Sequence, residues 1–307
     1  MQTTDTPFHY EKVTEQFLKE LRHLLADHQI TLDQGANSSL STGPLGSFRA
    51  FRSSPFLDIE SEIIVRPEST DQVADVVSLA HEWRIPVVPY GSGTGVMGGT
   101  SPVYRGILLD LRSLNSVLNV DPISHTATAQ SGLVLENLQN HLSGYGFMIG
   151  HDPWSRPIAT LGGAISTNGV GYLAAKYGTM GDQVLGLTVV LANGQVIRDK
   201  KTSKDSMGPD TKNLFIGSEG TIGIITEATI RIYPIPEYFE LLSFSFQSFA
   251  EGYQAILDMQ RLTVSPSMLD FAEEMDPNVM PSYHEIYLHL AFEGSPAVVK
   301  TAIDETY

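Results

Sequence analysis

The chain of 307 residues has no cysteine, few basic residues and no long apolar run. The missing cysteine excludes disulfide bonds, thiolate metal ligands and cysteine nucleophiles together. No segment approaches the roughly 20 apolar residues that span a bilayer, and the N-terminal residues do not follow the pattern of a signal peptide. Lys and Arg number 19 against 35 Asp and Glu, a formal net charge of −16. Because this charge repels nucleic acid and anionic membranes, we expect neither as a partner. The lack of a membrane span and of a signal peptide pattern predicts a cytoplasmic protein.

Helical and strand periodicities alternate along the chain. Val73, Val76 and Val77 share one face of a helix that Ser69 can cap. Strands are predicted over 62–66, 85–90, 106–111, 125–130, 184–191 and 221–233. Asn193-Gly194 favours a hairpin after the fifth of these strands. The stretches 31–49 and 151–171 are rich in glycine and other turn-forming residues and are interpreted as loops.

Pro234 and Pro236 interrupt this pattern and mark a domain boundary. After them, strands are predicted over 238–247, 267–272 and 285–292, and helices over 249–261 and 295–306. These few elements would leave a sheet with an open edge. We therefore expect the region 237–307 to be only the beginning of a domain.

The segment 89–95 alternates glycine with other residues. This spacing lets successive N–H groups point into one concavity, a nest that binds phosphate or pyrophosphate. Residues 86–104 contain no ionised side chain, so an anion there depends on amide dipoles and on the hydroxyls of Ser92 and Thr94. The pattern G-x-G-x-x-G also occurs at 93–98, but no helical period follows it, which disfavours a nicotinamide cofactor. A plain glycine-rich connection is the alternative.

Two further glycine-rich segments follow. The segment 152–171 combines Gly162-Gly163 and Gly169 with small hydroxyl residues, and no charge occurs from Pro157 to Ala175. The segment 217–223 has the sequence GSEGTIG and lies between a predicted short helix and a strand. Three such segments in one chain predict one large ligand with a phosphate part and an apolar ring part.

These segments carry a family resemblance. VVPYGSGTG, DPWSRPIATLGGAISTNGVG and NLFIGSEGTIGIITEATIRIYP occur in the order and spacing of the FAD-linked oxidases of the vanillyl-alcohol-oxidase type. Residues 61–236 resemble this family throughout, and most closely the FAD subunits of D-lactate and glycolate dehydrogenases and the alkyl-dihydroxyacetonephosphate synthases. The resemblance implies an α+β fold. A PCMH-type FAD-binding domain of two α+β subdomains would occupy 59–236, with the helix and loop of 1–58 as part of it, and 237–307 would begin a cap domain over the flavin.

The resemblance also implies which residues bind FAD. The pyrophosphate loop would comprise Pro89, Tyr90, Gly91, Ser92, Gly93, Thr94 and Gly95. The rest of the cofactor bed would comprise Asp152, Pro153, Ser155, Ala159, Thr160, Gly162, Gly163, Asn168 and Gly169. The residues that close over the adenine and flavin edges would be Glu219, Gly220, Ile224 and Ile225.

Two positions bear on the branch of the family. Members that bind FAD covalently carry histidine near Thr94, so the resemblance implies non-covalent FAD. Asn168 matches the dehydrogenases, since the synthases carry arginine there, whereas 208–237 is closer to the synthases. The resemblance therefore implies an oxidoreductase that transfers a hydride from a small 2-hydroxy acid to FAD. A synthase-like FAD enzyme and an inactive FAD-binding module are the alternatives.

The catalytic base and the substrate ligands are not identified, because the family places them in a histidine-containing motif that we expect beyond residue 307. The electron acceptor is also not identified, and the chain could form a homo-oligomer or a subunit of an oxidase complex. No metal site is predicted. His284 and His289 form H-E-x-x-x-H, one residue too long for a zinc-binding helix, and the alternation there favours a strand.

Three other residues keep two interpretations each. His151 is either a loop histidine bonded to backbone or a residue that faces the ligand. Tyr177 either packs between subdomains or flanks the flavin. Trp154 either packs within its proline-rich loop or stacks near the ring. Asp182 is interpreted as fixing the turn before the strand at 184–191.

Overall fold

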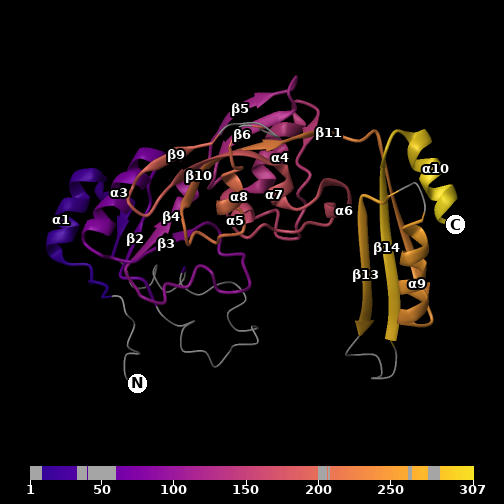
Figure 1. Ribbon diagram of the computed structural model, residues 1–307, viewed down its shortest axis with the longest axis horizontal. Coiled ribbons are helices and arrows are strands. Elements are labelled where there is room, and N and C mark those ends of the chain that lie inside the picture. The colour runs from indigo at the N-terminus through magenta and orange to yellow at the C-terminus, as the bar shows by residue number, and fades with distance from the viewer. Residues whose placement is uncertain are drawn as a thin grey trace.

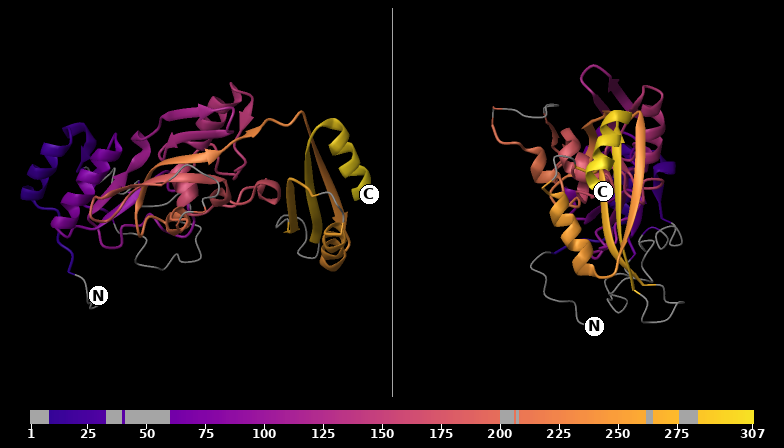
Figure 2. Two further views of the ribbon diagram at one scale, coloured as in Figure 1. Left: turned by 45° about the horizontal axis from the view of Figure 1, so that its top comes forward. Right: turned by 90° about the vertical axis from the view of Figure 1, so that its right-hand side faces the viewer.

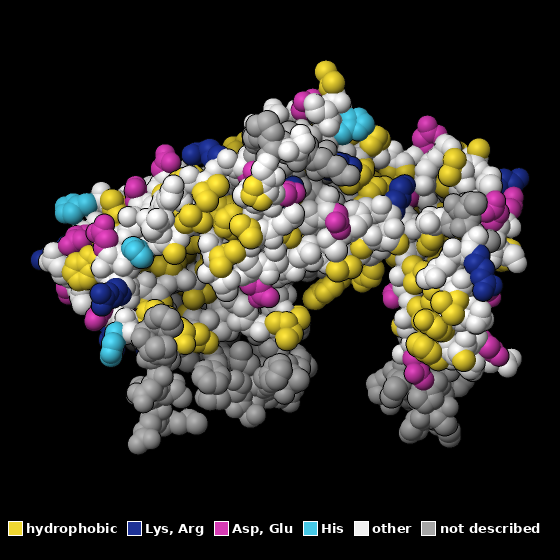
Figure 3. Space-filling view, in the orientation of Figure 1, with side chains coloured by type: hydrophobic (Ala, Val, Ile, Leu, Met, Phe, Trp, Pro, Cys, Tyr) yellow, Lys and Arg dark blue, Asp and Glu magenta, His cyan; other side chains and the backbone are white. Residues whose placement is uncertain are grey.

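The computed structural model describes residues 9–32, 40, 60–199, 206, 208–261, 265–275 and 284–307. Figure 1 shows a first sheet with its helices at the N-terminal end, a second sheet in the middle and a third, separate sheet at the C-terminal end. In the space-filling view of Figure 3, the part with the third sheet meets the rest of the molecule toward the top of the view. Most of the loop predicted over 31–49 lies outside the described residues. Within those residues, no helix has the length and apolar character that crossing a bilayer requires.

The first sheet has the strand order β1-β2-β4-β3. Its strands are β1 (Ile30–Thr31), β2 (Ile63–Val65), β3 (Val87–Tyr90) and β4 (Ile107–Asp110), with the 3₁₀ turns η1 (Asp27–Gln29) before β1 and η2 (Leu111–Ser113) after β4. β2 and β3 run parallel to β4, and β1 is antiparallel to β2. Helices α1 (Glu15–Leu24) and α3 (Thr70–Glu82) cover one face, where Phe17, Val73 and Ile107 share a core.

Helix α3 forms as the sequence predicts. The Ser69 hydroxyl accepts a hydrogen bond from the Gln72 N–H at 3.1 Å and caps the first turn. Val73, Val76 and Val77 are buried on the face that meets the sheet. The same helix contacts strands of the second sheet, where the Thr70 hydroxyl lies 3.0 Å from that of Thr226. α3 therefore links the two sheets.

The second sheet is antiparallel, with the order β5-β6-β10-β8-β9. Its strands are β5 (Val117–Asp121), β6 (Thr126–Gln130), β8 (Val184–Val190), β9 (Val196–Arg198) and β10 (Ile224–Arg231). Gly194, at φ +82°, turns β8 into β9, which confirms the predicted hairpin. Helices α4 (Leu135–Ser143) and α5 (Leu161–Ser166) share the core of this sheet. The α+β class is thus confirmed.

Short elements surround this sheet. Strand β7 (Phe147–Met148) pairs with β11 (Tyr233–Pro234), and the short helices are α6 (Ala174–Tyr177), α7 (Met180–Gln183) and α8 (Lys212–Phe215). The Asp182 carboxylate accepts hydrogen bonds from the Thr179 N–H at 2.7 Å and from its hydroxyl at 2.8 Å. The interpretation of Asp182 as the residue that fixes this turn is confirmed.

Helix α5 lies inside the stretch that the sequence predicts as loop, so that prediction is wrong. Gly162 and Gly163 disfavour a helix by intrinsic propensity. Thr160 caps the first turn by accepting a hydrogen bond from the Gly163 N–H at 3.3 Å. Leu161 and Ile165 are fully buried against the second sheet. This burial, a long-range effect, stabilises the helix despite its glycines.

The third sheet has the order β12-β14-β13 and is antiparallel. Its strands are β12 (Tyr238–Phe246), β13 (Met268–Met275) and β14 (His284–Gly294). Helices α9 (Phe249–Met259) and α10 (Pro296–Thr306) cover one face, as the right-hand view of Figure 2 shows. Leu288 and Leu290 are buried under these helices, which confirms the predicted alternation, and His289 points to the opposite face.

One buried carboxylate joins the third sheet to the rest of the molecule. The Glu293 side chain is only 2% exposed and lies 3.1 Å from the Lys176 ammonium group. The Tyr177 hydroxyl donates to the same carboxylate, and the Tyr177 ring packs on Tyr233 at 4.3 Å between centroids. Tyr177 therefore packs against the third sheet rather than between the two subdomains, and it does not line the cavity between the glycine-rich segments.

A second buried carboxylate lies at the end of β4. Asp110 is 2% exposed and accepts hydrogen bonds from Arg66 at 3.0 Å and from Arg112 at 2.8 Å. Burial by itself raises the pKa of Asp110, but the bonds from both guanidinium groups outweigh it and hold the pKa below the usual range. The Arg112 guanidinium also lies over the Tyr90 ring, 5.3 Å from its centroid. This network fixes the end of β3, where the first glycine-rich segment begins.

We predict that Asp110→Asn lowers the free energy of unfolding by about 3 kcal/mol at pH 7, because it leaves two guanidinium groups without their shared carboxylate. This loss is at the low end of that expected when one partner of a buried ion pair is removed, because both arginines are partly exposed. Urea unfolding measures the change in the free energy of unfolding. Asp75→Asn, on the exposed side of α3, removes the same charge and should change stability by no more than about 0.5 kcal/mol. Equal effects of the two variants would contradict the role of Asp110.

Candidate functional site

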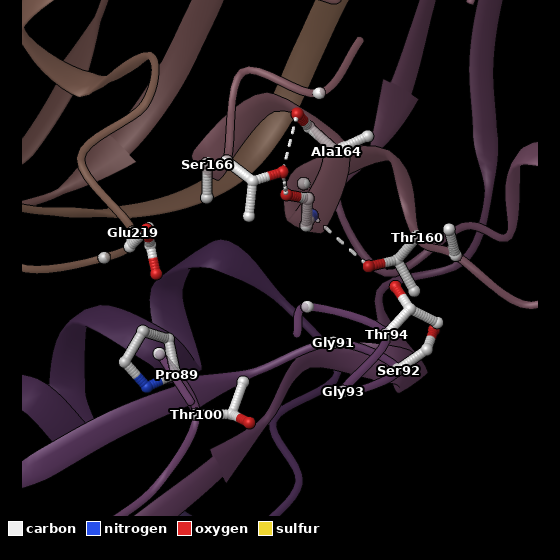
Figure 4. Close-up of a pocket in the computed structure, with 18 of the residues that line it drawn as sticks. Pro89, Gly91, Ser92, Gly93, Thr94, Thr100, Thr160, Ala164, Ser166 and Glu219 are labelled. Atoms are coloured by element: carbon white, nitrogen blue, oxygen red, sulfur yellow. Dashed lines mark hydrogen bonds between the residues drawn. The ribbon is translucent and has the colours of Figure 1, made fainter. Parts of the chain in front are cut away.

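A cavity of about 420 Å³ lies between the three glycine-rich segments. Its first wall is the segment after β3, its second wall is formed by α5 and the loops at its two ends, and its third wall is the turn before β10. Figure 4 shows the first wall below, the second wall above and Glu219 reaching in from the third. The fold therefore gathers segments that are far apart in the sequence around one space, as a single large ligand requires.

In the first wall, the backbone folds closely over Tyr90 and against the second wall. Gly93 has a φ of +66°, and a Cβ there would lie 2.8 Å from the Tyr90 hydroxyl. A Cβ on Gly91 would collide with the Thr160 hydroxyl. The Ser92 hydroxyl donates to the Ile158 carbonyl. Glycine at 91 and 93 lets the segment present its backbone to the cavity.

In the second wall, α5 packs tightly against the end of β6. A Cβ on Gly162 would lie 2.6 Å from the Cβ of Ser131, so this approach requires glycine. The Ser131 hydroxyl is buried, and no hydrogen-bond partner for it occurs in the part of the chain that the structure describes. Ser131 belongs to the cavity lining, but its hydroxyl is enclosed by protein at this close approach of α5 and does not reach the cavity.

The third wall is held to the second by backbone hydrogen bonds. The Gly217 and Glu219 N–H groups donate to the carbonyls of Ile165 and Ser166 at 3.1 and 2.9 Å. Glu219 has a φ of +50°, and its carboxylate lies over Gly99, where any side chain would collide with it. A Cβ on Gly220 would collide with the Pro89 ring. The positive φ at Glu219 is uncommon for a residue with a side chain and is kept by these contacts.

The structure brings nearly all the predicted site residues to this cavity. Those that line it are Pro89, Tyr90, Gly91, Ser92, Gly93, Thr94, Gly95, Pro153, Ser155, Ala159, Thr160, Gly162, Gly163, Gly169, Glu219, Gly220, Ile224 and Ile225. The two others, Asp152 and Asn168, do not line it. Asp152 accepts a hydrogen bond from Arg156 at 3.0 Å, and the Asn168 amide oxygen accepts one from the Gly181 N–H at 2.9 Å. Both residues hold loop backbone near the cavity.

Two lining residues, His151 and Trp154, were considered for the site as one of two interpretations each. The lining residues that the sequence did not assign to the site are Val96, Met97, Gly99, Thr100, Leu111, Ser131, Ala164, Ser166, Thr167, Val170 and Gly223. Glycine and hydroxyl content could have indicated Gly99 and Ser166, because they belong to the same segments. No local sequence pattern indicates Ser131 as a site residue, because the pairing of β6 with β10 brings it to the cavity.

His151 faces the cavity rather than solvent. Its side chain is buried, with the residue 2% exposed, and among the described residues its Nδ1 atom has no hydrogen-bond partner. Burial lowers its pKa from 6.5 to about 4, so the imidazole is neutral at pH 7. This placement favours the second interpretation of His151, as a residue that faces the ligand.

The charge of the lining agrees with the sequence prediction. No Lys or Arg lines the cavity, and Glu219 is its one charged side chain at neutral pH among the described residues. A phosphate-bearing ligand fits if backbone amides hold its phosphates. Apolar side chains lie at the rim, where Trp154 and Val170 are 69% and 70% exposed. Adjacent exposed apolar side chains at the edge of a cavity form a surface on which an apolar ring can pack.

Comparisons with known proteins agree with this geometry. Residues 61–200 match the FAD binding domain family. The chain is 36% identical over 228 residues to a glycolate oxidase subunit of Bacillus subtilis, which covers 74% of this chain and 48% of that protein. It is 31% identical over 268 residues to a D-lactate dehydrogenase of Anaerostipes hadrus, covering 87% and 54%. The chain thus spans about half the length of these relatives.

A solved structure is similar over nearly the whole chain. An alkyldihydroxyacetonephosphate synthase superposes with a TM-score of 0.83 at 25% identity, covering 97% of this chain and 59% of that one. The similarity includes the third sheet as well as the part that contains the cavity.

The contact between the first two walls generates a prediction for the cofactor-free chain. Gly91→Ala should lower the free energy of unfolding by about 1 kcal/mol or more, because the new methyl group displaces the Thr160 hydroxyl that caps α5. Gly95→Ala is the matched control, since a Cβ there would meet nothing within 4 Å. Urea unfolding of both variants measures the difference. A Gly91→Ala chain as stable as Gly95→Ala would show that the walls do not touch as described.

The burial of His151 predicts a pH dependence. The unfolded chain takes up a proton near pH 6.5, whereas the folded chain does so only near pH 4. Lowering the pH from 7 to 4.5 therefore favours the unfolded state, by roughly 2 to 3 kcal/mol from this residue. Over the same pH change, the free energy of unfolding should fall less in His151→Gln than in the wild type, and the difference should equal the loss attributed to this residue. The control His81→Gln, which replaces an exposed histidine, should lose as much stability as the wild type. Equal losses in the wild type and His151→Gln would contradict a neutral buried imidazole.

The cavity geometry, the family match and the relatives agree with one another. An uncharged, glycine-lined cavity with an apolar rim fits FAD, and the matched region contributes its first two walls. Residues 61–200 are a domain of the FAD binding family, and the chain as a whole is similar to the FAD-linked proteins named above, as the resemblance to the vanillyl-alcohol-oxidase type predicts.

Proposed function

We propose that this chain is the FAD-binding part of an oxidoreductase that oxidises a small 2-hydroxy acid of the D-lactate or glycolate type. The observation that carries the proposal is the cavity between the three glycine-rich segments, which fits a phosphate-bearing cofactor with an apolar ring. The names of two relatives, a glycolate oxidase subunit and a D-lactate dehydrogenase, support the substrate class.

Within this proposal, the first and third walls have separate tasks. Bound FAD would supply the acceptor for the hydride that leaves the carbon bearing the substrate hydroxyl. The backbone N–H groups of 91–95 and the Thr94 hydroxyl would hold the pyrophosphate, whereas the Ser92 hydroxyl donates to the Ile158 carbonyl and ties the first wall to the second. The Glu219 carboxylate is repelled by phosphate, so it suits the ribose hydroxyls or the adenine amino group, which can donate to it.

We also propose that residues 237–307 begin a substrate-binding domain, with the FAD-binding domain over 59–236. The face of the third sheet without helices carries Glu293, which contacts α6 of the FAD-binding part. Ser243 and His289 lie on the same face, with the serine hydroxyl 2.7 Å from the imidazole Nδ1 atom. The Ser243 hydroxyl and the His289 imidazole suit a substrate carboxylate, because each can donate a hydrogen bond. The cytoplasmic location and the assembly into a homo-oligomer or an oxidase complex stay predictions.

A second candidate function is that of an alkyldihydroxyacetonephosphate synthase. The observation that favours it is the TM-score of 0.83 over 97% of the chain. Asn168 discriminates less between a dehydrogenase and a synthase than the sequence suggests. Its amide oxygen accepts a hydrogen bond from the Gly181 N–H, and the residue does not line the cavity.

We predict that FAD binds without a covalent bond, because the Thr94 hydroxyl cannot take the place of a flavin-linking histidine. The purified chain is saturated with FAD, and its absorbance spectrum is recorded before and after acid precipitation. The flavin bands should stay in the supernatant. Colour in the pellet would contradict non-covalent binding.

We also predict that a 2-hydroxy acid reduces the bound flavin. The test uses protein that includes the whole substrate-binding domain, because the base and the substrate ligands are expected there. It is loaded with FAD and mixed without oxygen with D-lactate, glycolate and longer 2-hydroxy acids, and loss of the flavin absorbance is followed. Bleaching by D-lactate and not by L-lactate supports the proposed reaction. A chain that binds FAD but is bleached by none of these acids would favour the synthase or an inactive FAD-binding module.

A further inference from the structure

The cavity has two chemically different ends, and α5 separates them. At its N-terminal end, the Thr160 hydroxyl, which accepts from the Gly163 N–H, faces the backbone of Gly91 in the first wall. Past its C-terminal end come Gly169 and Val170, which also line the cavity. The six residues of α5 rise by about 9 Å between these ends. The ribityl chain that joins the pyrophosphate of FAD to its ring spans a comparable distance, so the far end suits the ring.

His151 lies at this far end. A Cβ on Gly169 would stand only 3.1 Å from Cε1 and 3.2 Å from Nε2 of the imidazole, so the ring occupies the space that a side chain at 169 would need. The same end carries the exposed apolar side chains of Trp154 and Val170. His151 is thus a buried polar group in an apolar part of the lining.

We propose that His151 forms a hydrogen bond with the flavin ring of bound FAD and so positions the ring in the cavity. This inference rests on the FAD-binding part of the proposed function. It assigns to His151 a role that neither the family match nor the predicted set of cofactor residues gives it.

Two observations support this role. The Nδ1 atom is fully enclosed by protein, so Nε2, the nitrogen beside the lining residue Gly169, is the one that can reach a ligand. No hydrogen bond ties the imidazole to another described residue, so Nε2 is available to a ligand, and buried polar groups are rarely left without a partner. A neutral imidazole offers one donor and one acceptor, and a flavin ring has both kinds of partner in its carbonyl oxygens, its ring nitrogens and its N–H group. Because burial keeps His151 neutral at pH 7, it can bind the ring without placing a second charge in the cavity.

The test compares FAD with ADP, which carries the phosphates and the adenine of FAD but no flavin ring. Affinities of both are measured for the wild type, His151→Leu, His151→Gln and the control His81→Gln, whose residue is exposed on α3. His151→Leu should weaken FAD binding by about tenfold to a hundredfold and leave ADP binding within about twofold. His151→Gln, whose amide can take the place of Nε2, should recover part of the FAD affinity. The visible bands of bound flavin should shift in His151→Leu and not in His81→Gln.

A second variant tests position without removing the imidazole. Gly169→Ala should push the imidazole aside and weaken FAD binding more than ADP binding, in the direction of His151→Leu. Unchanged FAD affinity and unchanged flavin bands in His151→Leu would overturn the inference. Equal weakening of FAD and ADP would also overturn it, because that result indicates a structural role. None of these readouts uses a substrate, so a failure of hydroxy-acid bleaching would count against the proposed reaction and not against this contact.

Discussion

The buried carboxylate of Asp110 is the interaction on which the cofactor cavity depends. It holds Arg66 and Arg112 at the carboxyl end of β4, and Arg112 in turn lies over the Tyr90 ring at the end of β3. The first wall of the cavity folds over this ring, with Gly93 directly above the Tyr90 hydroxyl. A charge network at the sheet edge thus sets the position of a loop that has no charge of its own.

The walls of the cavity are held together by close backbone approach rather than by side-chain pairs. Gly91 meets Thr160, Gly162 meets Ser131, and Gly220 meets Pro89, each at a distance that excludes a Cβ. Hydrogen bonds from Gly217 and Glu219 to α5 complete the enclosure. A protein of net charge −16 can hold a pyrophosphate in this way because amide groups, which carry no net charge, supply the positive pole locally.

The third sheet is joined to this framework through Glu293, Lys176 and Tyr177. The contact lies just past the loop that carries Gly169 and Val170, so the cofactor cavity and the sheet share one short segment of chain. In the proposed oxidoreductase, this arrangement places the helix-free face of the sheet on the side of the cofactor. The polar pair of Ser243 and His289 on that face gives it a chemistry suited to a small acid.

The sequence by itself determined the features that depend on local chemistry. The Ser69 cap, the Asn193-Gly194 hairpin and the three glycine-rich segments follow from propensities and backbone freedom within a few residues, and the order of the segments identified the family. Only the tertiary structure decided α5, which burial of Leu161 and Ile165 stabilises against its glycines. It also decided that Asn168 binds Gly181 and that Ser131 and His151 line the cavity. These outcomes depend on packing between distant segments, which local sequence does not encode.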